Sequence, residues 1–213
     1  MKIYFTGDSI SVQYGPYIKS YLCGSLSYSS KEGEEKALTD LDKPQGANTG
    51  DSSMLLAFLK DKAKSGGIDA DVFFFNCGLH DIKTDPLTGA KQIPLPQYRE
   101  NLKAILDVQA KMKPSPVWIR TTPCDEAVHN NPASTFLRFS SDVVAYNQAA
   151  DEVMAEAGVP SVDLYTFTLN LGADLYCDHV HFYEHIREKQ AAFIAGWLAA
   201  YEALQTSRHE VLG

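Results

Sequence analysis

The sequence is poor in cysteine, has no long apolar run and carries no surplus of basic residues, and each of these absences excludes a class of protein. Four cysteines occur among 213 residues, at positions 23, 77, 124 and 177, without a Cys-x-x-Cys pair. This wide spacing is unlike a disulfide framework or a zinc knuckle. We expect four single, buried thiols.

Apolar runs stay well below the roughly 20 residues that a membrane span requires. The first ten residues, MKIYFTGDSI, enter a strand-like pattern directly and contain no apolar leader segment with a small-residue cleavage site. The chain as written is therefore expected to be cytoplasmic and to have no membrane partner.

Basic residues are outnumbered, because 19 Lys and Arg stand against 27 Asp and Glu and give a net charge of −8. A nucleic-acid partner, which requires a basic surface, is not expected. A hydrophobic share of 45% with 22% charged residues is ordinary for a globular protein. The length suits a single domain, residues 1–213, with a sizeable core.

Strand-like and helix-like segments alternate along the chain. Expected strands cover 2–5, one short segment within 27–49, 71–78, 116–122 and 160–165, and expected helices cover 15–24, 51–67, 97–112, 141–158 and 185–204. This alternation predicts an α/β fold, a three-layer αβα sandwich around a mostly parallel, flavodoxin-like five-stranded sheet. Two long polar loops, 83–96 and 123–140, are expected to frame a pocket.

Function in such a sheet gathers where the strands end, at their carboxyl edge. Three of these edges carry polar chemistry: TGDSIS (6–11), NCGLHDI (76–82) and CDHVHF (177–182). A fourth stretch, GANTGDSS (46–53), lies at the start of a helix, where backbone N–H groups point outward. The candidate site is therefore expected at this edge.

Two kinds of metal site are conceivable at this edge, and neither has enough ligands. The stretch HFYEH (181–185) matches the His-x-x-Glu-His pattern of inverted zinc proteases. That site needs a further acidic ligand, and Glu202 lies about five helical turns away, too far to contact the metal. A two-metal phosphoesterase site needs about four or more carboxylate and imidazole ligands, more than GDS and GLHD supply. We expect no metal ion and no cofactor.

Ser9 offers a third interpretation, nucleophilic catalysis. A serine at a strand-to-helix turn presents its hydroxyl at the sheet edge, but it is a weak nucleophile until a base takes its proton. His181 can be that base, and Asp178 can orient and stabilise its imidazolium. Alone, a Gly-Asp-Ser is more often a turn or cap and an Asp-x-x-His more often surface decoration.

Taken together, the stretches that carry these residues resemble one family over almost the whole chain. The four blocks are GDSI (7–10), NTGDSS (48–53), GLHD (78–81) and DHVH (178–181). Their order and spacing are similar to those of the SGNH hydrolases, also called GDSL esterases. The resemblance implies a catalytic triad of Ser9, His181 and Asp178. It also implies an oxyanion hole made of the Ser9 N–H, the Gly50 N–H and a side chain from the third block.

The third block departs from the family pattern. The family has Gly-x-Asn-Asp, whereas this chain has Gly78-Leu79-His80-Asp81. A neutral imidazole has one N–H and can donate it to an oxyanion as an amide does. His80 is therefore either the third oxyanion donor or a histidine packed and hydrogen-bonded behind Asp81.

Three further residues are candidates for substrate binding, namely Asp8, Asn48 and His179, and His179 is alternatively a partly exposed loop histidine. The long loop after residue 122 adds polar groups suited to sugar hydroxyls, namely His129, Asn130, Asn131 and Arg138. The resemblance implies hydrolysis of small acyl esters through an acyl-enzyme, with O-acetyl groups on carbohydrate as the leading substrate. A short-chain carboxylesterase or thioesterase on other substrates, and a catalytically silent carbohydrate-binding relative, remain open.

Overall fold

The computed structural model describes residues 1–22 and 26–212, with side chains described up to Leu204. The described residues form one parallel sheet of five strands in the order β2-β1-β3-β4-β5. The strands are β1 Lys2–Thr6, β2 Ser27–Ser30, β3 Val72–Phe75, β4 Ser115–Ile119 and β5 Ser161–Val162. This is the flavodoxin-like winding order, so the predicted fold is confirmed.

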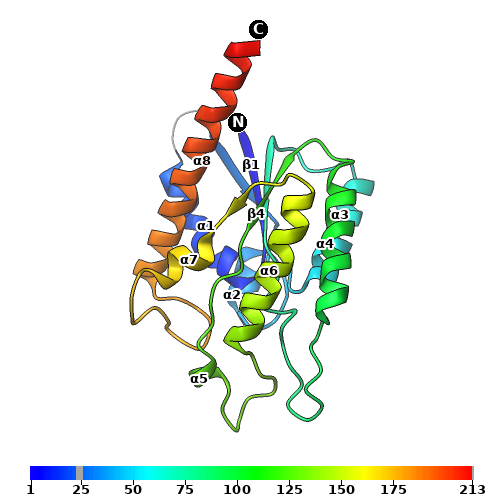
Figure 1. Cartoon of the computed structure of the whole chain (residues 1–213). Coiled ribbons are helices and arrows are strands. Elements are labelled where there is room, and N and C mark those ends of the chain that lie inside the picture. The colour runs from blue at the N-terminus through cyan, green and yellow to red at the C-terminus, as the bar shows by residue number, and fades with distance from the viewer. Residues whose placement is uncertain (23–25, 213) are drawn as a thin grey trace.

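Helices cover both faces of the sheet. They are α1 Ser9–Tyr21, α2 Glu34–Leu38, α3 Ser52–Lys64, α4 Leu95–Gln109, α5 Glu126–His129, α6 Ser140–Glu156, α7 Leu164–Leu169 and α8 Glu184–Leu212. Helices α1, α7 and α8 pack together on one face, and α3, α4 and α6 on the other (Figure 1). None of the described helices is long and apolar enough to cross a bilayer.

The central strand β3 explains why both faces are covered. Its sequence, VFFF, is buried throughout, and such a continuous apolar run is typical of a parallel strand with helices on each side. Phe74 contacts Trp197 of α8 edge-on at 5.9 Å, whereas Phe73 and Phe75 stack on each other at 5.3 Å. Because successive side chains alternate faces, this one strand anchors both helical layers.

The first helix begins six residues earlier than predicted. The sequence placed a helix over 15–24 with Pro16 near its first turn, but α1 starts at Ser9 and Pro16 lies inside it. The Asp8 side chain accepts a hydrogen bond from the Ile10 N–H at 3.0 Å and caps the helix at this point. The predicted end near Gly24 lies outside the described residues.

Three short helices, α2, α5 and α7, were not expected, and the segment predicted as a strand over 160–165 is shorter than expected. Strand β5 ends at Val162 because the Asp163 side chain then accepts from the Thr166 N–H at 3.0 Å and starts α7. Each of these helices has six residues or fewer, so none produces a clear amphipathic period.

The carboxyl ends of the strands face the end of the molecule from which the loops 83–96 and 123–140 extend, opposite the C-terminal end of α8 (Figure 1). The two loops are joined, because Thr84 and Leu137 exchange both backbone hydrogen bonds at 2.8 Å. These loops therefore form one connected rim beside the sheet edge.

The expectation of single, buried cysteine thiols is confirmed only in part. Cys77 and Cys124 are buried free thiols, but Cys177 is free and exposed, because it lies on the loop that precedes α8. The prediction of burial was therefore wrong for Cys177. Cys23 lies outside the described residues.

Candidate active site

Ser9 lies at the junction between the central region of the sheet and the first helix. It is the first residue of α1, and the short Gly7-Asp8 turn connects it to β1. Its side chain is nearly buried, and its Oγ lies 2.8 Å from His181 Nε2. The strand-to-helix turn thus presents the hydroxyl to an imidazole from a segment 172 residues away.

His181 is held from its other side by Asp178. Its Nδ1 lies 2.7 Å from Asp178 Oδ2, while Asp178 Oδ1 accepts the backbone N–H groups of Val180 and His181 at 2.8 and 2.7 Å. Partial burial raises the pKa of Asp178, but the hydrogen bonds from His181 and Val180 outweigh it and leave that pKa well below its usual range. An ionised Asp178 favours the tautomer in which Nδ1 carries the proton and Nε2 is free to accept from Ser9.

The backbone amides near Ser9 differ in their availability. In the described structure no hydrogen bond engages the Ser9 N–H, which is one of the unpaired amides at the start of α1. The Gly50 N–H, in contrast, donates to Asn48 Oδ1 at 2.9 Å. Gly50 must lose this bond before it can donate to a substrate oxygen.

The side-chain amide of Asn48 is fully engaged in hydrogen bonds with backbone groups. Besides accepting from Gly50, its Nδ2 donates to the carbonyl oxygens of Leu41 and Lys43, both at 3.4 Å. Gly50 has a φ of +68°, a conformation that favours glycine, and a Cβ there would lie 2.6 Å from Pro44 Cβ. The structure therefore places Asn48 as a support of this turn and not as a free donor.

His80 is buried beside the site with an unused nitrogen. It is 2% exposed, and its Nδ1 has no hydrogen-bond partner among the described residues. Burial, followed by the charges of Lys83 and Arg138, lowers its pKa well below the usual range. His80 is therefore a neutral imidazole at pH 7, able to donate one N–H without adding charge.

The alternative partner for His80, Asp81, is engaged elsewhere. Both of its carboxylate oxygens accept from the Ser52 N–H, at 3.0 and 3.1 Å, so Asp81 links the third block to the start of α3. Full burial raises the pKa of Asp81 to about 8, although the bonds from Ser52 lower it in part. The structural interpretation of His80 therefore has packing in its favour but no bond to Asp81.

The raised pKa of Asp81 predicts a pH dependence of stability. The folded state binds the proton more tightly than the unfolded state, whose aspartate pKa is about 3.9. This contribution is fully present below about pH 4 and is lost as the pH rises through about 8. We expect the free energy of unfolding, measured with urea, to fall between pH 5 and pH 8.5, and less steeply in Asp81→Asn. Asp107→Asn on the exposed side of α4 is the control, and an unchanged slope in Asp81→Asn would assign the effect to other groups.

A groove of about 670 Å³ opens beside Asp178 and His181. Its lining includes Asp42, His129, Phe136, Asp178 and His179. His179 Nε2 lies 3.3 Å from Asp42 Oδ1, and its ring packs on the His129 ring with centroids 4.4 Å apart. The contact with His179 lowers the pKa of Asp42 to about 2. The structure therefore places His179 in the wall of the groove, in the loop that carries Asp178 and His181.

Asp8 does not reach this groove. It is 2% exposed, one of its oxygens caps α1, and Oδ2 has no partner among the described residues. Asp8 lines a separate cavity of about 180 Å³ beneath α1. Asp8 therefore supports the turn at Ser9 and is not part of the groove lining.

The polar residues expected on the long loop have divided roles. His129 and Asn131 line the groove, whereas the Asn130 amide binds the backbone of Arg138, donating to its carbonyl at 2.7 Å and accepting from its N–H at 2.9 Å. Asp42, Lys83 and Phe136 were not singled out from the sequence. The position of Lys83, two residues after the third block, was the one available signal.

The zinc pattern in 181–185 does not form a site. No group of three or more His, Cys, Asp or Glu within the described residues is arranged to hold a metal ion. His181 is buried in its contact with Ser9, whereas His185 is exposed on the first turn of α8. The helix begins at Glu184, inside the pattern, so the two histidines do not share one helical face.

Comparison with known proteins gives matches only among solved structures, since no family model and no curated protein matches the chain. An acetyl xylan esterase superposes with a TM-score of 0.68 at 15% identity, covering 93% of this chain and 99% of the esterase. A lipolytic protein of the G-D-S-L family from Veillonella parvula gives 0.64 at 14% identity, covering 91% and 95%. A carbohydrate acetylesterase from Sinorhizobium meliloti gives 0.65 at 12% identity, covering 94% and 99%.

The coverage is nearly complete on both sides of each comparison, so the likeness extends over the whole domain and not over a sheet core alone. The chain has the fold of the SGNH hydrolases, which the four sequence blocks led us to expect. At these identities the likeness concerns the fold, and the chemistry must be argued from the residues of this chain.

Proposed function

We propose that this chain, which has the fold of the SGNH hydrolases, is a serine esterase that removes small acyl groups, chiefly O-acetyl groups on carbohydrate. The observation that carries the proposal is the chain of contacts from Ser9 Oγ to His181 Nε2 at 2.8 Å and from His181 Nδ1 to Asp178 Oδ2 at 2.7 Å. Each distance lies within hydrogen-bond reach, as a nucleophile, its base and the group that orients the base require.

In the proposed mechanism Ser9 Oγ attacks the ester carbonyl while His181 Nε2 takes the hydroxyl proton. Asp178 stabilises the imidazolium, and the oxyanion of the tetrahedral intermediate lies against the Ser9 N–H and the His80 imidazole. His181 then gives the proton to the departing alcohol, which leaves an acyl group on Ser9. A water molecule, activated by the same imidazole, releases the acid and restores the hydroxyl.

The carbohydrate assignment is supported by the groove and by the neighbours. The groove beside the triad is open and presents imidazole, amide and carboxylate groups, which suit hydroxyl-rich ligands. Two of the similar structures belong to an acetyl xylan esterase and a carbohydrate acetylesterase. A third, an aryl esterase from M. smegmatis, keeps non-sugar esters as the second candidate.

Release of acetate tests this function. The purified protein is incubated with an aryl acetate, an aryl butyrate, a thioester and a panel of acetylated monosaccharides and xylan oligomers. We expect turnover of the aryl acetate and faster release from acetylated sugars than from alkyl acetates. Turnover of aryl esters without any acetylated sugar would favour the short-chain esterase, and sugar binding without turnover would favour the silent relative.

His80 is expected to act on the transition state. His80→Ala should lower kcat by up to about 10²-fold, the lower end of the roughly 10²- to 10³-fold (about 2.7–4 kcal/mol) that one oxyanion donor is worth at a well-studied site, because the Ser9 N–H remains. KM should change little, since the charge that His80 stabilises exists only in the transition state. His80→Asn restores an amide donor and should recover much of the loss. Steady-state kinetics on the aryl acetate measures all three proteins.

The control for His80 is His185→Ala, which removes an exposed imidazole from α8. Melting temperatures are recorded beside the kinetics, because a packed histidine replaced by alanine destabilises the fold without changing the kcat of the folded protein. A folded His80→Ala protein with the kcat of the wild type would remove His80 from the oxyanion hole.

A further inference from the structure

Arg138 is a buried cation without a close counter-ion among the described residues. It is 2% exposed, its Nε donates to the Leu79 carbonyl at 3.0 Å, and its Nη1 has no partner among the described residues. No carboxylate of the described chain lies within 4.0 Å of its guanidinium, although Asp42, Asp8 and Asp178 act on it from further away. A buried charge without a close partner costs free energy, and an anionic ligand paired with the guanidinium would offset this cost.

The backbone of Arg138 is held firmly. The Asn130 amide binds its N–H and its carbonyl, and the preceding residue, Leu137, is paired with Thr84 through two hydrogen bonds. These contacts fix the backbone of the loop on both sides of Arg138. The guanidinium is therefore a pre-organised group whose buried Nη1 has no hydrogen-bond partner among the described residues.

Lys83 brings a second positive charge to the same place. Lys83 Nζ and the Arg138 guanidinium lie 4.5 and 4.9 Å from the centroid of the Phe136 ring. Lys83 donates to the Asp42 carbonyl at 3.3 Å, and none of the ion pairs among the described residues includes it. Burial, then the charge of Arg138, lowers the pKa of Lys83 to about 8.

This pair of cations stands out in an acidic chain. The net charge is −8, yet Lys83 and Arg138 meet at Phe136 and repel each other there. Phe136 lines the groove that contains Asp178 and His179, and it also lines a second groove of about 750 Å³ that contains Lys83. Lys83 therefore lines one groove, and the Arg138 guanidinium packs on the Phe136 ring that lines both.

We propose that Arg138, assisted by Lys83, binds a carboxylate of the substrate and gives the enzyme a preference for anionic esters. The proposal rests on the proposed esterase function and adds the charge class of its substrate. A carboxylate matches the free Nη end of a guanidinium, which donates two parallel hydrogen bonds. A dianionic phosphate fits less well, because Asp42 and Asp178 already lie in the adjoining groove.

The carboxylate can belong to either side of the scissile bond. On the acyl side the substrate is a half-ester of a dicarboxylic acid, and on the alcohol side it is an acetylated uronic acid. Two matched pairs of esters separate these sources: aryl hemisuccinate against aryl butyrate, and acetylated glucuronate against acetylated glucose. The measured quantity is the ratio of kcat/KM for the charged ester to that for the neutral one.

We expect a ratio above one in at least one pair, and that pair identifies the side of the carboxylate. Arg138→Gln keeps a donor for the Leu79 carbonyl but removes the charge. It should lower the ratio roughly 10- to 100-fold, as expected for a hydrogen bond between charged groups. Lys83→Gln, at a less buried position, should lower it by a smaller factor. Taking the ratio cancels any loss of general activity in either variant.

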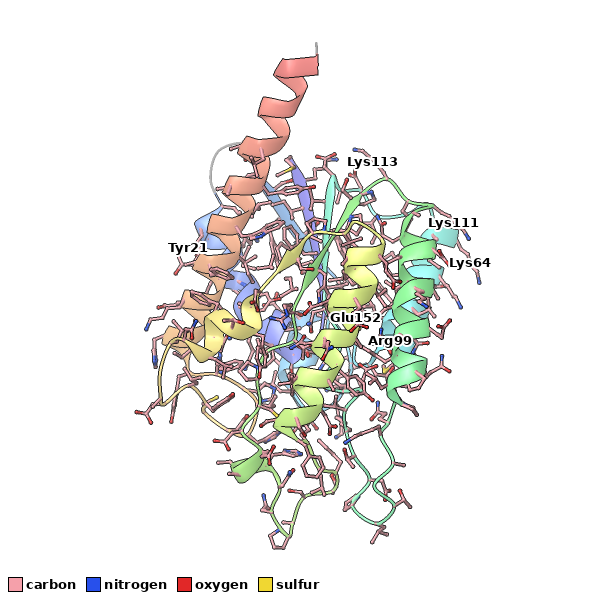
Figure 2. The ribbon with its side chains drawn as sticks, viewed as in Figure 1. Tyr21, Lys64, Arg99, Lys111, Lys113 and Glu152 are labelled. Carbon is pink, nitrogen blue, oxygen red and sulfur yellow. The ribbon has the colours of Figure 1, made fainter. Side chains whose placement is uncertain are left out.

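The control is Arg99→Gln, which removes one positive charge at a distance from the grooves. Arg99 pairs with Glu152 at 2.6 Å between α4 and α6 (Figure 2). This variant should keep the ratio of the wild type. If Arg138→Gln fails to fold by circular dichroism, the ratios of the wild type and of Lys83→Gln decide the matter.

Calorimetric titration of the wild type with glucuronate, succinate and glucose adds a readout that needs no turnover. Binding of one of the two acids, weakened in Lys83→Gln and Arg138→Gln, supports the carboxylate site even if no ester is hydrolysed, in which case the esterase function alone fails. Turnover of neutral esters, with ratios near one in both pairs and no binding of either acid, overturns the carboxylate site and leaves the esterase function standing.

Discussion

Replacement of Ser9 by alanine is expected to lower kcat on an aryl acetate by about 10⁴-fold or more, because the covalent route through the acyl-enzyme is lost. A fluorophosphonate should label the wild-type protein at Ser9 and leave the alanine variant unlabelled. The residual rate would come from the amides and imidazole that remain around the carbonyl. Initial rates and mass spectrometry of the labelled peptide measure both effects.

Ser9 contributes little to the fold around it, so its replacement is expected to change activity without changing folding. Its side chain bonds to His181, whereas the cap of α1 is supplied by Asp8. Ser9→Ala should therefore fold with a melting temperature near that of the wild type. Ser20→Ala, at the exposed far end of the same helix, serves as the matched control and should keep both activity and labelling. An adduct on another residue, or none on an active wild-type protein, would remove Ser9 from the mechanism.

The sheet could be predicted because its strands differ sharply from their surroundings. The run DVFFFNCG contains the buried strand β3. The start of α1 could not be predicted this way. Its first residues, Ser9 to Ser11, resemble a turn, and only the cap from Asp8 and the packing of α1 on α8 make them helical.

The candidate site was partly predictable for a local reason. An Asp-x-x-His turn places the carboxylate where it accepts the backbone N–H groups of Val180 and His181 and faces the imidazole, so the Asp178–His181 contact follows from spacing. The long-range contacts do not follow from spacing. Arg138 contacts Leu79 across 59 residues, and this contact depends on how two loops pair.

The contacts of Asn48 were also not predictable from the sequence, although they are local. The sequence offered it as a possible donor to the site, yet its amide oxygen accepts from the Gly50 N–H two residues later. Asparagine often forms such a turn with its own backbone, so the local bond competes with any role toward substrate. The composition of the block cannot reveal which of the two wins, because the outcome depends on the nearby carbonyl oxygens of Leu41 and Lys43.

The second large effect is expected from Asp178→Asn, which should lower kcat by roughly 10³- to 10⁴-fold. The carboxylate has two distinct neighbours, since Oδ1 accepts two backbone N–H groups and Oδ2 faces His181 Nδ1. In the variant the amide oxygen must take the first position, because N–H groups already point there. The amide NH₂ then faces Nδ1 and donates to it. This forces the imidazole proton onto Nε2, which can no longer accept from Ser9.

Kinetics on the aryl acetate and ¹⁵N NMR of labelled histidine test this argument together. In Asp178→Asn we expect the His181 proton to move from Nδ1 to Nε2, with the loss in kcat and with slower fluorophosphonate labelling of Ser9. Asp174→Asn is the matched control, because it makes the same substitution at an exposed position of the same loop, where a positive φ of 56° also suits asparagine. A folded Asp178→Asn protein with the kcat of the wild type would show that Asp178 does not act through His181, and a lost activity without a change of tautomer would assign the effect to the position of the ring.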